Sequence, residues 1–433
     1  MTQSTADMNS TVNNSTTVSI NATRIETIKK LINNKPTNCT VAGRTFKINP
    51  DTFVPVLYVG GRRCGKTTIM ASIYDNAIFS SAAGNGLKIV ACDKNMEDKL
   101  AKNVKDLKDK AEAGVLEIGG ISPTPNVDYY DFVVYNTKDT AEDACILLRF
   151  IDVCGEIYQD ATEEQRVQLA EIVHDTKIIL VAVDSVSLME SEETAENYYD
   201  FNTISDIEGV FKNLKKGDER KLVLFVPVKC EKYYIENKAS DLITNIETKY
   251  SGVISAISKN SPSDAVAITP VQTVGILEFS KYLHATEDAI SSQQQFVKNW
   301  DLMGDLGNYA PLCCDQVLWY IFRFIYRDAD VPYQEEVNVK KSIFKSILKG
   351  VFTGNLFASI VEIFKTVKES DKKSYKTIKA IYEYELGKEL YNSTKILTQE
   401  QYNDIKRWHP VNGVLGNRSE FGYKVIRDES NIF

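Results

Sequence analysis

The chain has 433 residues, of which 43% are hydrophobic and 25% are charged, and its formal net charge is −8. These values are typical of a soluble globular protein with two domains, or with one large domain and appendages. The acidic balance excludes a general attraction to nucleic acid, and the sequence carries no specific nucleic-acid signal. Its eight cysteines lack paired Cys-x-x-Cys spacing and it has only three histidines, which disfavours a zinc site and suits the reducing cytoplasm.

Residues 1–39 are rich in Ser, Thr and Asn and contain no signal-peptide core. This composition predicts a disordered or loosely attached N-terminal segment. The stretch Thr40–Ile48 then alternates in polarity like an edge strand that leads into the core. No uninterrupted apolar run is long enough to span a bilayer, so we expect a cytoplasmic protein.

The most informative motif follows the apolar strand Val54–Val59. Gly60, four further residues and then Gly65, Lys66 and Thr67 make the complete spacing of a phosphate-binding loop. Glycines let the backbone approach phosphate closely, and N–H groups at a helix start face the anion. Lys66 can reach the β- and γ-phosphates, and Thr67 can offer its hydroxyl to Mg²⁺. Nucleotide contacts are expected from Gly60, Gly61, Arg62, Arg63, Cys64, Gly65, Lys66, Thr67 and Thr68.

Strand and helix signals alternate along this part of the chain. The expected strands continue with Leu87–Cys92, Tyr129–Tyr135, Cys145–Ile151, Ile178–Val183, Leu222–Val228 and Ala265–Ile268. The expected helices include Thr67–Ile78, Met96–Ala113, Glu163–His174 and Ile204–Leu214. Such alternation predicts an α/β fold, the three-layer sandwich of P-loop NTPases, with a mostly parallel central sheet and a C-terminal helical region.

A proline-rich segment before the strand Tyr129–Tyr135 contains Thr124. The hydroxyl of a threonine in this position can complete the Mg²⁺ shell of a nucleoside triphosphate. Ser122 is an alternative ligand, and an ordinary proline-rich turn explains the segment about as well.

The strand Cys145–Ile151 leads into Asp152, and Gly155 follows three residues later. An aspartate at a strand tip can hold Mg²⁺ through water, and the glycine amide can bind the γ-phosphate and report its presence. ATPases of the transporter and helicase type usually have glutamate directly after this aspartate. Val153 stands there instead, which favours a GTPase arrangement.

The strand Leu222–Val228 runs into Lys229 and Glu231, which resemble the Asn-Lys-x-Asp signature for guanine with two substitutions. Lys229 would lie along the base, and Glu231 would accept hydrogen bonds from guanine. A Lys-Glu pair on a solvated loop is the alternative, so guanine and adenine both remain open. The segment Thr269–Gly275 lies where a GTPase has its base-supporting loop.

Together these motifs resemble those of the Ras-like (TRAFAC) P-loop GTPases. Their residues are most similar to those of bacterial double-GTPase proteins of conflict and phage-defence systems. The resemblance spans Phe53–Tyr326, with the phosphate-binding loop as its most specific part. It implies binding of GTP or GDP with Mg²⁺, slow GTP hydrolysis and a switch controlled by an effector or regulator protein.

Glu156 stands where Ras-like enzymes have the glutamine that orients the attacking water. A glutamate could orient water or act as a base, but its charge would repel the γ-phosphate unless it were compensated. Arg62 and Arg63 are candidates for this compensation, one of them as an arginine finger. The alternative is that both point to solvent. Catalysis is therefore expected from Lys66, Glu156 and Arg63.

The region after residue 330 has a different composition. Between Val339 and Ala380 there are ten lysines and three acidic residues. The segment 340–368 combines lysines with a wide apolar face, so it could bind a membrane surface or a partner groove. It could equally pack on the preceding domain. We expect a GTPase domain over 40–330 and a helical extension over 331–433.

The expected function is a GTP-binding switch that hydrolyses GTP slowly in a bacterial defence system. A second copy of the chain is one candidate partner, in a homo-oligomer. Two alternatives stay open. The weak base signature also allows an ATP-using P-loop enzyme. Glu156 and the basic segment 340–368 also allow a scaffold or membrane adaptor that binds nucleotide without hydrolysing it.

Overall fold

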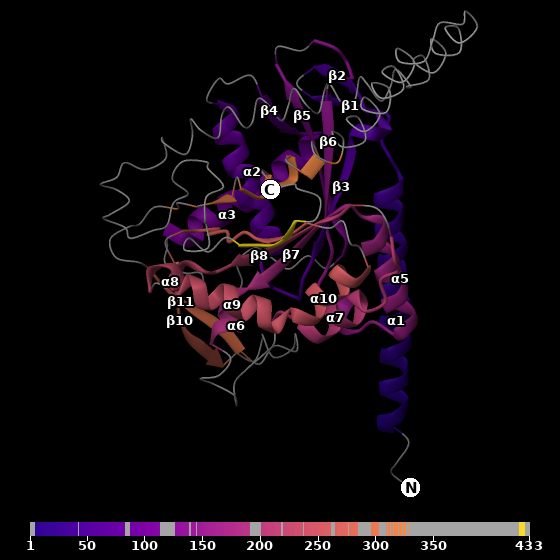
Figure 1. Ribbon diagram of the computed structural model, residues 1–433, viewed down its shortest axis with the longest axis vertical. Helices are drawn as coiled ribbons and strands as arrows, with labels where there is room; N and C mark the ends of the chain where they lie inside the picture. Colours follow the sequence, from indigo (N-terminus) through magenta and orange to yellow (C-terminus); the bar gives the residue numbers. More distant parts are fainter. Residues whose placement is uncertain are drawn as a thin grey trace, which may run out of the picture.

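A computed structural model describes most of residues 5–302, short pieces between 309 and 328, and residues 424–428; its longest internal gaps before residue 302 are 113–125, 191–200 and 285–295. An eight-stranded sheet forms the centre of the described part (Figure 1), and its strands follow the order β12-β9-β8-β7-β3-β6-β5-β4. Its parallel strands are β3 (Phe53–Val59), β6 (Cys145–Asp152), β7 (Ile178–Asp184), β8 (Leu222–Val228) and β9 (Ala265–Ile268). Its antiparallel edges are β4 (Leu87–Ala91) and β5 (Asp128–Asn136) on one side and β12 (Lys424–Asp428) on the other.

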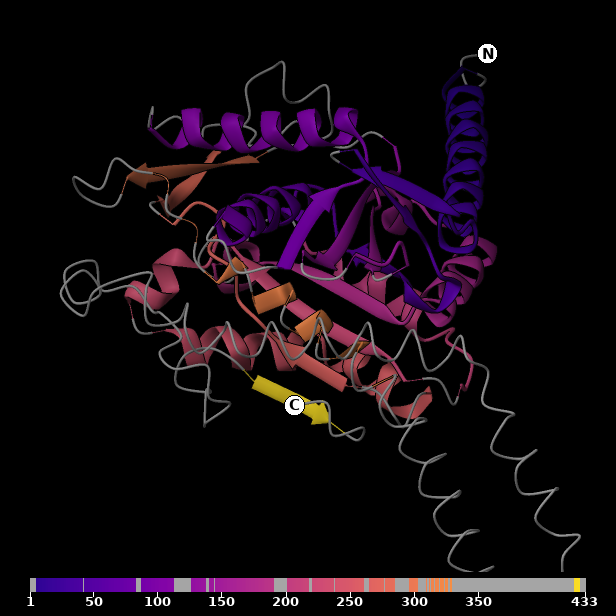
Figure 2. The ribbon, with the colours of Figure 1, turned by 90° about the horizontal axis from the view of Figure 1, so that it is seen from above.

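Every residue of β6, β7, β8 and β9 is buried. Parallel strands covered on both faces have such continuous apolar runs, because no residue of the strand meets water. Helices cover both faces of the sheet (Figure 2), and a separate hydrophobic cluster fills each interface. This arrangement confirms the predicted three-layer α/β fold.

One face carries α2 (Lys66–Ala82), α3 (Lys94–Glu112) and the helical residues described between 314 and 325. The other carries α1 (Thr5–Asn33), α4 (Glu156–Gln159), α5 (Glu163–Asp175), α6 (Ser185–Met189), α7 (Ile204–Phe211), α8 (Glu231–Ile235), α9 (Ala239–Lys249) and α10 (Ser251–Asn260). None of the described helices is long and apolar enough to cross a membrane.

The N-terminal segment corrects the expectation of disorder or loose attachment. Residues Thr5–Asn33 form α1, which runs beside α5 (Figure 1). Ile25 and Ile28 are fully buried and Ile32 is 7% exposed. These isoleucines recur at helical spacing and form one apolar face, although the Ser, Thr and Asn around them give the segment the composition of a disordered tail.

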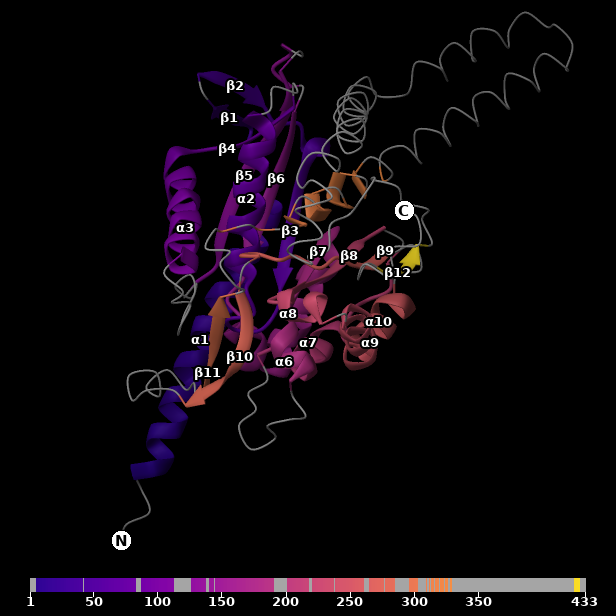
Figure 3. The same ribbon diagram turned by 90° about the vertical axis from the view of Figure 1, so that its left-hand side faces the viewer.

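Three further features depart from the sequence analysis. The stretch expected as one strand is a hairpin of β1 (Asn38–Val41) and β2 (Arg44–Lys47), followed by the short 3-10 helix Pro50–Thr52. After Gly275, β10 (Leu277–His284) and β11 (Phe296–Leu302) form a second hairpin. β12 belongs to the region expected to be helical but lies antiparallel to β9 (Figure 3). The basic segment 340–368 lies outside the described residues, and the domain boundary after residue 330 stays a prediction.

Candidate functional site

The phosphate-binding loop connects the end of β3 to the start of α2. Gly60 and Gly65 have φ angles of +154° and +100°, which residues with a side chain rarely adopt. A Cβ atom on Gly60 would also lie 2.7 Å from Cys64 Sγ, well inside van der Waals contact. Both positions therefore require glycine. Without side chains there, the loop can present its backbone N–H groups and the amino end of α2 to an anion.

Lys66 opens α2 and is 7% exposed. Its Nζ donates hydrogen bonds to the carbonyl oxygens of Gly60 at 2.8 Å and Gly61 at 2.7 Å. The Cys64 thiol donates to the same Gly61 oxygen at 3.0 Å, and burial raises its pKa, so it stays a neutral donor. The hydrogen bonds thus fix the Lys66 ammonium against the loop, and a lysine ammonium binds phosphate as a point charge.

Thr67, in the first turn of α2, meets Asp152 at the end of β6. The Thr67 hydroxyl donates to Asp152 Oδ2 at 2.7 Å, because Asp152 lies opposite Tyr58 in the β3–β6 pairing, near the start of the loop. Hydroxyl and carboxylate oxygens suit Mg²⁺, which commonly takes one or two protein ligands and fills its shell with water and phosphate oxygens. No cluster of three His, Cys, Asp or Glu that could hold a metal occurs among the described residues. Thr124 and Ser122 lie outside them.

The turn after β6 packs directly on the phosphate-binding loop. A Cβ atom on Gly155 would lie 2.1 Å from the Arg62 nitrogen and 2.3 Å from the Gly61 carbonyl carbon. The next residue, Glu156, places Oε1 3.0 Å from Arg62 Nε. The structure therefore pairs Glu156 with Arg62, one of the two arginines considered for this compensation.

Lys229 ties the β8 loop to the phosphate-binding loop. Its Nζ donates to Asp184 Oδ2 at 2.6 Å and to the Arg63 carbonyl oxygen at 2.9 Å. Asp184 is fully buried at the end of β7, where its carboxylate also accepts from the Ser187 amide at 2.9 Å. Sequence analysis missed Asp184, although an aspartate that ends a buried strand next to a phosphate-binding loop was an available signal.

Glu231 connects the two loops that were expected to surround the base. It opens α8, is 4% exposed, and accepts a hydrogen bond from the Gly275 amide at 3.3 Å. The segments that follow β8 and β9 therefore meet at this carboxylate. The roles expected of these two loops toward a base stay predictions.

A buried segment before α7 forms a wall of the phosphate-binding loop, and sequence analysis missed it. The Asn202 side chain makes two hydrogen bonds with the backbone of Asp184, accepting from its nitrogen at 2.7 Å and donating to its oxygen at 3.1 Å. The Phe201 carbonyl oxygen lies 2.0 Å from where a Cβ atom of Gly61 would be. A polar residue that hydrogen-bonds one partner far away in the sequence belongs to no periodic pattern, so the sequence gives no signal for it.

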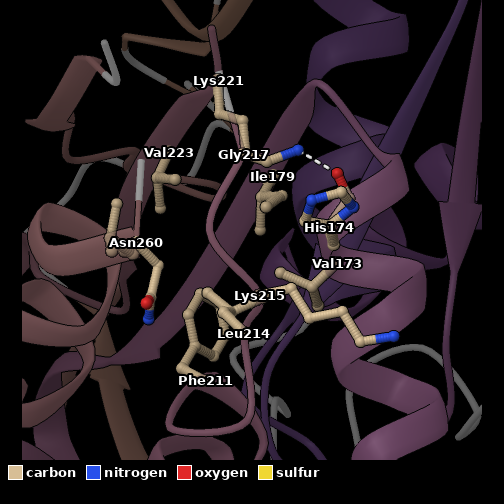
Figure 4. A pocket seen from close by; sticks show the side chains of 11 residues that line it. Val173, His174, Ile179, Phe211, Leu214, Lys215, Gly217, Lys221, Val223 and Asn260 are labelled. Atoms are coloured by element: carbon tan, nitrogen blue, oxygen red, sulfur yellow. Dashed lines mark hydrogen bonds between the residues drawn. The ribbon is translucent and has the colours of Figure 1, made fainter. Parts of the chain in front are cut away.

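The predicted residues within the described part of the chain thus gather at the carboxyl ends of β3, β6 and β8, where open α/β sheets bind ligands. The part of the chain that the structure describes also contains a small pocket at the opposite edge, next to Ile179 and Val223 near the amino ends of β7 and β8 (Figure 4). Lys221 crosses its rim and donates to the carbonyl oxygens of His174 and Thr176. This pocket is remote from the phosphate-binding loop and does not belong to the candidate site.

No protein-family model matches the chain, and no curated protein matches it. Among solved structures, the chain is similar to the S. cerevisiae Ski7 GTPase-like domain, which was crystallised with GDP and inorganic phosphate. The match has 13% sequence identity and a TM-score of 0.26, and it covers 51% of this chain and 43% of the Ski7 chain. It therefore spans less than half the length of that structure. The fold assignment rests on this chain's own strand order and phosphate-binding loop.

Proposed function

We propose that this protein binds GTP with Mg²⁺ and hydrolyses it slowly to GDP and phosphate. The observation that carries the proposal is the meeting of three groups at one loop: the Lys66 ammonium, the Thr67–Asp152 pair, and Lys229 from the following loop. A phosphate chain needs the first two groups. The third joins the expected base-binding segment to the phosphate-binding segment.

Each residue then has a role in the proposed reaction. The loop 60–68 and Lys66 bind the phosphates. Gly155 packs against the backbone of Arg62 in this loop, and its amide is assigned to the terminal phosphate. Bound Mg²⁺, held by Thr67 and Asp152 and completed by Thr124, would neutralise charge that develops on the phosphates.

The attacking water is assigned to Glu156. The negative charge of its carboxylate is compensated by Arg62. Arg63 remains a candidate for the arginine finger that contacts the phosphates. A carboxylate is a less suitable water-orienting group than a neutral amide beside a phosphate, because like charges repel. The proposal therefore includes slow intrinsic turnover.

Glu231 supports guanine as the base. It is a buried carboxylate at the junction of two loops, and a site built to accept hydrogen bonds from a base discriminates strongly against a base that lacks the donors. Adenine offers no ring N–H at the corresponding position. Binding of ATP would therefore contradict the role assigned to Lys229 and Glu231.

Calorimetric titration with GTP and with ATP in Mg²⁺ tests the proposal directly. The wild-type chain should bind GTP and ignore ATP, and Lys66→Ala should lose GTP binding. Lys47→Ala serves as a control, because Lys47 is 71% exposed on the β1–β2 hairpin. Preference for ATP would replace the proposal with an ATP-using enzyme. Tight GTP binding without phosphate release would replace it with a nucleotide-dependent scaffold.

We extend the proposal to a switch that controls an effector in bacterial phage defence, on the strength of the motif resemblance alone. Capture of a partner by the chain loaded with a non-hydrolysable GTP analogue, and not by the GDP-loaded chain, would support the switch. Protection of host cells from phage by the wild type but not by Lys66→Ala would support the defence role. Equal capture in both nucleotide states would contradict the switch.

A further inference from the structure

Helix α1 reaches the candidate site through one side chain. Arg24 projects from α1 so that its Nη2 lies 3.8 Å from Glu156 Oε2, while its Nη1 donates to Asn21 Oδ1 at 3.1 Å. Its side chain is 15% exposed, compared with 27% for Glu156. Arg24 therefore makes a largely covered ion pair, whose charges water screens less than those of a surface pair.

Glu156 consequently has an arginine at each carboxylate oxygen. Arg62 from the phosphate-binding loop lies 3.0 Å from Oε1, and Arg24 lies on the Oε2 side. The three side chains together carry one net positive charge. Because Arg24 pairs with the second carboxylate oxygen of Glu156, Glu156 neutralises only part of the positive charge of Arg62. The remainder can act on a phosphate.

The position of Arg24 is set by contacts along α1. Arg149, on the same strand as Asp152, binds Asp131 with two bonds of 2.7 Å. Its Nη1 also donates to the carbonyl oxygens of Leu31 at 2.9 Å and Asn34 at 3.0 Å, which holds the C-terminal end of the helix against β6.

The other end of the packed part of α1 is held by the segment that follows Glu156. Gln165 of α5 donates from Nε2 to the Val18 carbonyl oxygen at 2.9 Å. The Asn21 amide donates to the Asp160 carbonyl oxygen at 3.5 Å. Between these points, the buried isoleucines pack α1 on the core. The helix that bears Arg24 is thus held by β6 at one end of its packed part and by α5 at the other.

We propose that Arg24 is a positioning residue for hydrolysis, which fixes the Glu156 carboxylate and neutralises it. This inference rests on the proposed GTPase function and adds α1 to the site. Arg24 is expected to influence the reaction through Glu156, so its removal should slow turnover and leave the nucleotide contacts of the loop intact. Its contribution should vanish when Glu156 carries no charge.

The test is a double-mutant cycle read by steady-state GTP hydrolysis. Arg24→Ala should lower kcat about fivefold, the effect expected from losing a partly covered ion pair, with the KM for GTP within about twofold. Arg24→Lys, which keeps the charge, should recover part of the loss. In the Glu156→Gln background, Arg24→Ala should have no further effect on kcat.

Calorimetry and thermal unfolding separate the outcomes. Lys29→Ala is the matched control, since Lys29 lies on the same helix and pairs with exposed Glu26 at 3.6 Å. An equal fall in kcat in both backgrounds, or no fall at all, would overturn the role of Arg24 while GTP binding and hydrolysis stand. GTP binding without any hydrolysis would overturn the role of Arg24 together with the proposed hydrolysis, and would leave the nucleotide-dependent scaffold. A wild-type chain that binds no GTP would instead sink the proposed function.

Discussion

Replacement of Gly155 by alanine tests the packing of the β6 turn on the phosphate-binding loop. The new Cβ atom would lie 2.1 Å from the Arg62 nitrogen, 2.3 Å from the Gly61 carbonyl carbon and 2.6 Å from the Arg62 Cα. All three neighbours are backbone atoms, so no flexible side chain can turn away. The methyl group is roughly 1 Å too close to each of them, and one of the two segments must therefore move.

The size of the effect follows from this overlap. Forcing an extra carbon into packed structure costs about 1–3 kcal/mol. If nucleotide binding requires the loop in its present position, GTP affinity should fall by about fivefold to 150-fold, because 1.4 kcal/mol corresponds to a factor of ten. The melting temperature should also fall, by a few degrees.

Calorimetric titration with GTP and GDP, together with thermal unfolding, measures both effects. Gly209→Ala is the matched control, because a Cβ atom there would lie 3.4 Å from a side-chain nitrogen of Arg166 and could be accommodated. Wild-type GTP affinity and melting temperature for Gly155→Ala would refute the backbone contact between the two segments.

Three more perturbations follow from contacts at the site and at α1. Glu231→Gln should weaken GTP binding by about tenfold through loss of a charged acceptor, with ATP binding unchanged in competition experiments; an unchanged GTP affinity would exclude contact with the base. Lys229→Met should lower the free energy of unfolding by about 3 kcal/mol in denaturant titration, because buried Asp184 loses its cation, and adding Asp184→Asn should restore part of it. Ile28→Ala should lower the free energy of unfolding by about 2–5 kcal/mol; a decrease below about 1 kcal/mol would mean that α1 does not pack on the core.

The central sheet was predictable because its signals are local. Apart from Arg149 in β6, the buried strands are apolar runs bounded by polar residues, and the strand Leu222–Val228 has the same limits in the sequence analysis and the structure. The phosphate-binding loop was predictable for a related reason, since glycine and lysine spacing is written in consecutive residues. The functional roles of these residues remain predictions.

The missed features depend on partners far away in the chain. Arg24 meets Glu156 and Asn202 meets the Asp184 backbone only after folding, and neither residue belongs to a periodic pattern. Composition misled the prediction for α1, because the many Ser, Thr and Asn residues conceal three isoleucines at helical spacing that bury one side of the helix. β12 could not be found from its own five residues, since its strand conformation depends on pairing with β9.

The pairing of β12 with β9 has a consequence for fragments of this protein. A chain cut after residue 330 would keep all of the candidate site but would leave β9 as an unpaired edge, with free N–H and C=O groups that invite association with other chains. The long connection between the two strands weakens their pairing little, because the entropy of closing a loop grows only with the logarithm of its length. We therefore expect a fragment that ends at residue 330 to self-associate, and a fragment intended for crystallisation should keep the chain through residue 428, so that β12 covers this edge.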